Sequence, residues 1–184
     1  MAQTAQPQPK TAWVVDPVHS NVEFAVRHMV IATVKGRFAK FQIKAGFDET
    51  RPENTSVEGT IDAASVDTGE AKRDEHLRSP DFFDAANFPQ ISFKSRRVER
   101  RGGDEYRMVG DLTIRDTTRE APFDVTFAGI VKDPWGNQRA GFTATTTLNR
   151  KDFGLKWNMP LEAGGLLVSD TVKVSVEVEL VKQK

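Results

Sequence analysis

The side chains of this sequence best suited to chemistry near neutral pH are its three histidines, His19, His28 and His76. An imidazole ring can bind a metal ion or transfer a proton in this pH range. The spacing of the three residues matches no zinc motif, and a zinc site needs ligands that converge in space. His19 and His28 also differ in strand parity, so we expect them on opposite faces. We therefore predict no metal site, and two roles remain for His28: a hydrogen bond to backbone inside the fold, or contact with a ligand.

A polar cluster of Arg73, Asp74 and His76 lies next to aromatic residues in the sequence. Arginine binds carboxylates and phosphates through two parallel hydrogen bonds. Arg73 and His76 could therefore hold the head group of a ligand, such as a pyrophosphate, a carboxylate or a quinone. The alternative is structural, with Arg73 paired to a nearby carboxylate and fixing a helix. The candidate carboxylates are Asp74, Asp81 and Asp84.

Catalytic motifs are missing from the sequence. It contains no nucleophile elbow, no phosphate-binding glycine loop and no metal-ligand spacing. The acid pair Asp81 and Asp84 falls on an expected short helix, where capping explains it. We therefore predict a protein that is not an enzyme. The alternative is a small enzyme that uses His28 or His76 as an acid or a base.

The polar and aromatic residues lie in a segment, 70–88, that does not alternate between apolar and polar residues. Two short helices are expected there, one from Glu70 to Leu77 and one from Pro80 to Asp84. Ser79 followed by Pro80 suits an N-cap with proline at the first helical position. We expect the segment to cover one end of a β-barrel, with Phe82, Phe83 and Phe88 closing that end.

The rest of the sequence after Trp13 alternates with a period of two, which is typical of strands with one apolar face. Short turns join several of these stretches, so neighbours in sequence should pair antiparallel. Closing such a sheet into an up-and-down, lipocalin-like barrel covers the apolar face and removes the edges. The alternative is a two-sheet sandwich. Eight strands are expected, at about 20–28, 37–47, 56–63, 90–99, 105–114, 121–132, 138–149 and 171–181.

The inward faces of these strands combine large and small apolar residues. The chain has 12 phenylalanines and a single tyrosine, which favours a dry interior. An eight-stranded barrel can be filled by side chains or can hold one small ligand. The small inward residues either interlock with the rings or leave a cavity; they are Ala45, Gly59, Gly110, Gly129 and Ala144. The predicted ligand-binding residues are Phe24, His28, Phe41, Ile43, Ile61, Phe82, Phe83, Phe93, Met108, Phe127, Phe142, Leu148 and Trp157.

A second interruption of the alternating pattern spans 149–165. It contains Trp157, Met159 and the pair Gly164 and Gly165. We expect a mobile flap between the last two strands, through which a lipid would enter. A contact between two copies of the chain is the competing use for Trp157 and Met159.

Length and composition restrict the remaining possibilities. The 184 residues suit one domain over 12–184, preceded by a Gln- and Pro-rich tail over 1–11 that we expect to be disordered. A formal net charge of zero argues against nucleic acid as a partner. No run approaches the roughly eighteen apolar residues of a membrane span. The start of the sequence lacks the apolar core of a signal peptide, so we expect a cytoplasmic protein, or a periplasmic or secreted one if a signal was removed.

Several blocks, in order along nearly the whole chain, resemble the YceI-like, polyisoprenoid-binding family. They are Asp16 to Phe24 with His28, Gly36 to Phe38, Ser65 to Thr68, Arg73 to Leu77, Asp81 to Asp84, Phe88 to Phe93, Gly110 to Ile114 and Asn149 to Gly154. One departure is Asp116, where the family commonly has glycine, and it affects a turn.

The resemblance implies a lipocalin-like barrel, often a homodimer, that holds a long isoprenoid or similar amphiphile. Candidate ligands are a polyprenyl phosphate, a quinone or a fatty-acid-like lipid, and no other cofactor is expected. We therefore predict binding, transport or storage of such a lipid. A solid barrel that binds another protein remains a further alternative.

Overall fold

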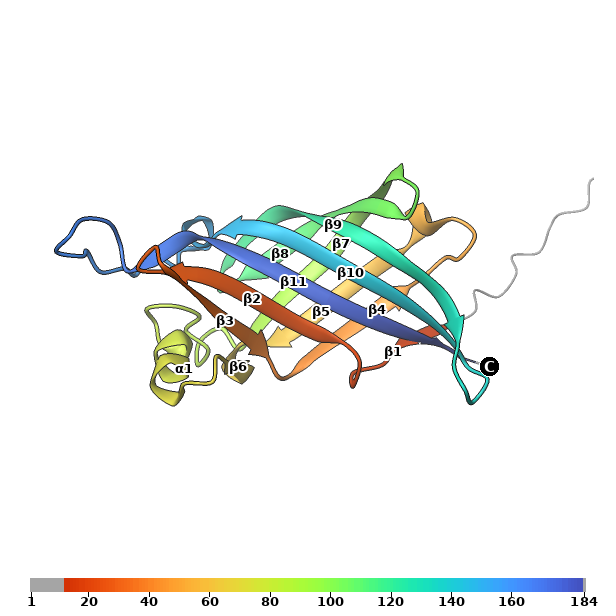
Figure 1. Ribbon diagram of the computed structural model, residues 1–184, viewed down its shortest axis with the longest axis horizontal. Coiled ribbons are helices and arrows are strands. Elements are labelled where there is room, and N and C mark those ends of the chain that lie inside the picture. Colours follow the sequence, from red (N-terminus) through yellow and green to blue (C-terminus); the bar gives the residue numbers. More distant parts are fainter. Residues whose placement is uncertain (1–11, 184) are drawn as a thin grey trace, which may run out of the picture.

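The computed structural model describes residues 12–183, which form one strongly curled antiparallel sheet with a few short helices (Figure 1). The strands are β1 (Trp13–Val15), β2 (Asn21–His28), β3 (Ala32–Phe38), β4 (Phe41–Gly46), β5 (Ser56–Asp62), β6 (Val66–Asp67), β7 (Gln90–Gly102), β8 (Glu105–Ile114), β9 (Thr117–Lys132), β10 (Gln138–Asn149) and β11 (Val168–Lys182). The helices are α1 (Ala71–Arg78) and the 3-10 turns η1 (Pro52–Asn54), η2 (Ala63–Ser65) and η3 (Arg150–Phe153).

The expected all-β, lipocalin-like barrel is confirmed, although the sheet has eleven strands and not eight. Neighbouring strands follow the order β4-β5-β7-β8-β9-β10-β11-β2-β3-β6, and β1 pairs with β11. A single continuous sheet excludes the two-sheet sandwich. The end strands β4 and β6 do not pair with each other within residues 12–183, and β1 lies against β4 where the curled sheet approaches itself.

The long strands β7 to β11 follow the alternating pattern of the sequence and pair in regular antiparallel ladders. A bulge interrupts the β9–β10 ladder, because Gly129 faces Gly141 while Phe127 faces Phe142, which leaves Ala128 without a partner. Gly129 has a φ of +99°, a conformation that favours glycine. Such bulges increase local twist and help a sheet to curl.

The single expected strand over 37–47 is wrong, because the chain turns sharply after Phe38. At that corner Ser65 accepts hydrogen bonds from two backbone amides. Its carbonyl oxygen accepts from the amide of Ala39 at 3.0 Å, and its hydroxyl oxygen accepts from the amide of Lys40 at 3.0 Å. β3 therefore pairs with β2 and β6, whereas β4 pairs with β5.

The expected helix over Pro80–Asp84 is also wrong, because Ser79 ends α1 and does not begin a second helix. The Ser79 amide and hydroxyl both donate to the carbonyl oxygen of His76, at 3.1 and 2.6 Å. The residues that follow form turns, and Asp84 adopts a left-handed φ of +48°. α1 itself begins at the Glu70 cap, whose carboxylate accepts from the amides of Lys72 and Arg73.

The two ends of the molecule differ. α1, β6 and the β10–β11 loop lie at one end, which we call the α1 end, and β1 and the C-terminus lie at the other, the β1 end (Figure 1). Within residues 12–183, no helix has the length and apolar character of a membrane span.

Candidate functional site

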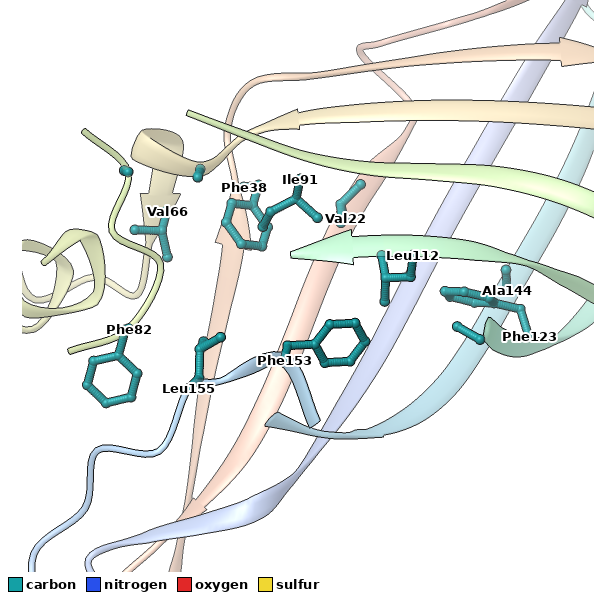
Figure 2. Close-up of a cluster of buried hydrophobic side chains, with 13 residues drawn as sticks. Val22, Phe38, Val66, Phe82, Ile91, Leu112, Phe123, Ala144, Phe153 and Leu155 are labelled. Atoms are coloured by element: carbon teal, nitrogen blue, oxygen red, sulfur yellow. The ribbon is translucent and has the colours of Figure 1, made fainter. Parts of the chain in front are cut away.

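The inside of the barrel contains an elongated apolar cavity of about 440 Å³. Side chains from most of the strands line it, together with residues from α1, the 80–88 turns and the β10–β11 loop. Figure 2 shows how part of this interior is built: Phe82, Phe153 and Leu155, from the connecting segments, lie across from strand residues such as Phe38 and Leu112. The interior is therefore not a solid core of interlocked rings.

The structure places most of the predicted ligand-binding residues on the cavity wall. Phe41 and Phe127 are exceptions, since neither lines the cavity: Phe41 packs against the main core, and Phe127 stacks on Phe142 with ring centroids 5.0 Å apart. The predicted residues that do line the cavity are Phe24, His28, Ile43, Ile61, Phe82, Phe83, Phe93, Met108, Phe142, Leu148 and Trp157.

The small inward residues play two different roles. At Gly110, an added Cβ would lie 2.4 Å from the carbonyl oxygen of Lys94 and 2.5 Å from Cζ of Phe93, so the neighbouring strand and its ring both pack directly on the glycine. At Gly59, whose neighbours across the ladders are Ile43 and Phe93, an added Cβ would meet only the carbonyl oxygen of Gln42, at 3.9 Å. Interlocking therefore explains Gly110, whereas Gly59 borders empty space in the cavity.

A cluster of aromatic rings fills the β1 end of the barrel. The ring centroid of Phe47 lies 5.5 Å from that of Trp13, 5.7 Å from that of Phe127 and 5.1 Å from that of Phe142. Phe47 and Phe142 line the cavity, and Trp13 lies behind them. The rings form the wall of the cavity at this end.

Polar side chains gather at the α1 end of the cavity, where Arg27 and Arg73 both line it and are exposed. Arg73 pairs with none of the three candidate carboxylates. Its Nε donates to Oγ1 of Thr68 at 2.7 Å and its Nη2 donates to the Thr68 carbonyl oxygen at 3.0 Å. The carboxylate of Asp74 is buried and accepts from the amide and hydroxyl of Thr68. The cavity therefore opens to solvent beside a fixed guanidinium group.

His76 lies one turn further along α1 and also lines the cavity. Its Nε2 is 2.8 Å from Oδ2 of Asp81, and its ring packs edge-on against Trp157 and Phe82, with centroids 4.6 and 5.1 Å away. The structure thus brings Trp157, which is remote in the sequence, against His76 of α1. His28 lines the same end, and within residues 12–183 its ring makes no backbone hydrogen bond of the kind we expected.

Arg150 is a buried cation that the sequence interpretation missed. Its side chain lines the cavity and its guanidinium group donates to the carbonyl oxygens of Leu155 at 2.7 Å, Trp157 at 2.8 Å and Ser169 at 2.9 Å. Burial lowers the pKa of this guanidinium group, and the charge of Asp170 opposes that shift. The first part of the expected flap is therefore bonded into the wall, and Phe153 and Leu155 are buried core residues.

Other lining residues were also missed, although alternation places several of them on the inward face. The sequence could have identified Phe47, Phe123 and the valines of β11, because their positions in the alternating pattern put them on the inward face. Phe38, Phe153 and Leu155 carry no such signal, because a corner and a loop place them. The missed lining residues include Val22, Phe38, Phe47, Leu77, Tyr106, Leu112, Phe123, Phe153, Leu155, Val174, Val176 and Leu180.

His19 belongs to an ionic cluster at the opposite end of the molecule. Asp16, His19 and Glu179 place ligand-type atoms within 4.8 Å of one another. The guanidinium group of Arg139 already lies among them, since it donates to Asp16 at 2.8 Å, to Glu179 and, through Nε, to Asp133 at 2.8 Å. A cation of the chain therefore offsets part of the negative charge of these carboxylates.

The cluster shifts the pKa values of its members. Hydrogen bonds from His19 and Arg139 hold the pKa of Asp16 well below its ordinary value. The hydrogen bond from Arg139 lowers the pKa of Asp133 to about 2. The same contacts raise the pKa of Arg139, and the hydrogen bond to Asp16 raises the pKa of His19. All four shifts favour the charged forms in the folded protein.

Known proteins resemble this chain in both sequence and fold. UPF0312 proteins of Staphylococcus epidermidis and Staphylococcus aureus are each 36% identical to it, over 165 residues (89% of this chain and 94% of the relative) and 170 residues (92% and 96%). Among solved structures, BcnA of Burkholderia cenocepacia matches with a TM-score of 0.78 and 25% identity, covering 90% of this chain and 98% of BcnA.

Two further solved structures extend the comparison. The YceI protein of Campylobacter jejuni matches with a TM-score of 0.75 and 28% identity, covering 86% of this chain and 90% of that one. A polyisoprenoid binding domain from Saccharophagus degradans shares the fold, with a TM-score of 0.63 and 16% identity over 95% of this chain and all of that one. The sequence profile of the YceI-like domain matches residues 13–180, and the chain therefore belongs to the YceI-like family.

Proposed function

We propose that the protein binds the long apolar chain of an isoprenoid-type amphiphile inside the barrel, as a carrier or a store. The observation that carries the proposal is the apolar cavity of about 440 Å³, a size typical of small-molecule sites. Membership of the YceI-like family supports it, as does the name of the S. degradans relative, a polyisoprenoid binding domain.

Burial of hydrocarbon supplies the binding free energy. Each buried methylene group contributes about 0.8 kcal/mol, so an isoprene unit contributes roughly 3–4 kcal/mol before ordering costs. Leu112, Phe123 and Val176 are examples of wall residues without any polar side-chain atom. Such a wall selects an apolar chain, since a polar one would lose its hydrogen bonds to water.

The head group belongs at the α1 end, beside Arg73 and His76. A guanidinium group has five N–H donors, and two of the hydrogen bonds of Arg73 go to Thr68. Thr68 therefore holds the guanidinium in place while further donors remain for an anionic or carbonyl oxygen. A polyprenyl phosphate, a quinone or a similar amphiphile fits this arrangement.

The proposed role is non-catalytic. Either histidine of the cavity, His28 or His76, could act as an acid or a base in an enzyme. His76 is already bonded to Asp81 and packed edge-on against two aromatic rings, which suits a fixed part of the wall. Lipid recovered chemically unchanged after long incubation with the protein would support binding, whereas lipid turnover lost in His76→Ala would support an enzyme.

A variant that fills the cavity tests the proposal. Gly59→Phe puts a ring into the empty space beside Gly59, and Gly59→Ala, the matched control, adds only a methyl group there. We expect organic extraction followed by mass spectrometry to recover lipid from the wild type and from Gly59→Ala. Gly59→Phe should retain at least about tenfold less, because the ring takes the volume of several methylene groups.

Binding of farnesol, a short isoprenoid alcohol, to protein stripped of lipid provides a second measurement. Titration calorimetry should show binding to the wild type and to Gly59→Ala but not to Gly59→Phe. Equal retention of lipid by both Gly59 variants, with circular dichroism showing both folded, would overturn the proposal. So would a wild type that neither yields lipid nor binds farnesol.

A further inference from the structure

Exposed apolar side chains gather on two loops at the α1 end. Met29, Val30 and Ile31 form the β2–β3 turn, and the last two are 68% and 79% exposed. Met159 and Leu166, also exposed, lie in the β10–β11 loop. The two loops lie side by side, because the amide of Met29 donates to the carbonyl oxygen of Leu167 at 2.8 Å (Figure 1). We call these five residues the apolar tip.

The apolar tip is held in shape by specific contacts. Arg27 donates from Nη2 to the carbonyl oxygen of Val30 at 2.7 Å and from Nη1 to Oγ1 of Thr33 at 3.1 Å. In the other loop, the amide of Leu167 donates to the carbonyl oxygen of Met159 at 2.9 Å, and Pro160 and Leu166 form a β-bridge. The two loops therefore present their side chains in a defined arrangement.

The backbone of the β2–β3 turn has a conformation that methionine and valine rarely adopt. Met29 and Val30 have φ values of +50° and +64°. A β-branched residue is rare in this region, and glycine or asparagine would adopt it more easily. Such backbone strain is associated with functional sites. The turn therefore presents apolar side chains where local conformation alone would favour polar ones.

The apolar tip is continuous with the cavity. His28, Trp157 and Leu167 line the cavity, and in the sequence they adjoin or nearly adjoin the exposed residues Met29, Met159 and Leu166. Between Asn158 and Leu167 the only charged residue is Glu162. The cavity wall thus extends outward into an apolar surface, with Arg27 as the cation beside it.

We propose that the apolar tip docks onto a lipid bilayer, so that an apolar chain passes between the hydrocarbon phase and the cavity without crossing water. The purpose of docking rests on the proposed function, but docking itself does not require lipid in the cavity. A bilayer fits the tip because it is where such chains reside and because it demands no matching charges. Peripheral segments bind bilayers by burying apolar area in the interface.

Flotation with phosphatidylcholine vesicles tests the proposal, and these carry no net charge, which suits an almost uncharged tip. In the double variant Val30→Asn/Ile31→Asn, both apolar side chains are lost, while asparagine suits the left-handed turn at position 30. We expect the vesicle partition coefficient to fall at least about tenfold, since two large apolar side chains no longer enter the bilayer. Thermal unfolding should show a variant as stable as the wild type.

Trp135→Ala is the matched control. Trp135 is 79% exposed, like Ile31, but it lies in the β9–β10 turn at the β1 end (Figure 1). If exposed hydrophobicity alone drove binding, wherever it lies, loss of this side chain would also weaken vesicle binding. We expect Trp135→Ala to bind vesicles as the wild type does. A folded tip variant with unchanged vesicle binding, or a loss confined to Trp135→Ala, would overturn the proposal.

Two further measurements distinguish bilayer docking from lipid retention in the cavity and from self-association. Gly59→Phe, with a filled cavity and an intact tip, should float with vesicles as the wild type does, so failure to hold lipid and failure to dock are distinguishable. Sedimentation analysis tests a second copy of the chain as the occupant. A dimer that the tip variant dissociates, together with no vesicle binding by the wild type, would overturn docking in favour of self-association.

Discussion

Arg150 shows how one buried cation can shape the wall of the cavity. Its guanidinium group joins the carbonyl oxygens of Leu155 and Trp157, near the start of the β10–β11 loop, to that of Ser169 on β11. Trp157 in turn packs against His76 at the α1 end. Arg150 therefore positions Trp157 by a hydrogen bond to its backbone carbonyl oxygen.

Replacement of Arg150 should destabilise the fold strongly. In Arg150→Ala the carbonyl oxygens lose their buried donors. The negative charge of Asp170 loses one of the cations beside it. We expect the free energy of unfolding to fall by about 3–5 kcal/mol, as is typical when one partner of a buried charged network is removed. Urea unfolding monitored by tryptophan fluorescence measures the change.

Lys151→Ala is the control for this prediction. Lys151 also pairs with Asp170, at 3.0 Å, but its side chain is 40% exposed. The loss should be below about 1 kcal/mol, as for surface ion pairs. Equal losses in the two variants would contradict the role assigned to Arg150.

At the scale of elements, the ionic cluster around Arg139 joins segments that are remote in sequence. Asp16 lies between β1 and β2, Asp133 lies in the β9–β10 turn, and Glu179 lies on β11. Arg139, on β10, contacts all three carboxylates. The cluster therefore links the end of the sheet around β1 to the long strands.

The cluster should make stability depend on pH in two windows. The pKa of Asp133 is lowered from 3.8 to about 2, and that of Asp16 is lowered further, so their contribution is present above pH 3.8 and is lost as pH falls toward 2. The pKa of His19 is raised from 6.5, so its contribution is complete below pH 6.5 and is lost as pH rises through the raised value.

Urea unfolding of the wild type and of His19→Asn across this pH range separates the two windows. The stability difference between them should be largest near pH 5 and should disappear in alkaline solution. His28→Asn provides the comparison, since His28 lies outside the cluster. A difference that is constant with pH would show that the charge of His19 contributes nothing to folding.

The elements also show what the sequence could and could not predict. Alternation identified the long strands β7 to β11, because their pattern extends over many residues. It missed β1 and β6, which are too short to show a period, and it merged β3 with β4, because the turn at Ala39 depends on Ser65 from a distant segment. The Ser79 cap was assigned to the wrong helix, since the same residue can end one helix or begin another.

The residues of the candidate site were also predicted only in part from the sequence. Parity places Phe24, Phe93 and Phe142 on the inner face, and they line the cavity. Phe127 shares that parity but packs within the aromatic cluster, because parity gives the face of a strand and not the distance to the opposite wall. Burial of Arg150 depends on carbonyl groups of a loop, and local sequence carries no sign of it.

At the scale of the whole molecule, the cavity links stability to its contents. A ligand that binds only the folded state stabilises it in proportion to the logarithm of its free concentration. The empty space next to Gly59 means that the unliganded barrel forgoes contacts which a bound chain would restore. The barrel should therefore be less stable when empty.

Removal of lipid should lower the melting temperature. At a free ligand concentration of about one hundred times Kd, the stabilisation is about 2.7 kcal/mol, which for a domain of this size corresponds to about 5–11 °C. Calorimetry of stripped protein with and without farnesol measures the shift. Gly59→Phe should show none, and a wild type whose melting temperature ignores added farnesol would contradict an accessible cavity.

The ring cluster of Trp13, Phe47, Phe127 and Phe142 also gives the barrel a fixed stop. Under the proposed function, a chain that enters past α1 would advance only until it reaches Phe47 and Phe142, the two rings of the cluster that line the cavity, and any excess length would stay outside. The length of hydrocarbon that the barrel encloses would then be set by the protein and not by the lipid.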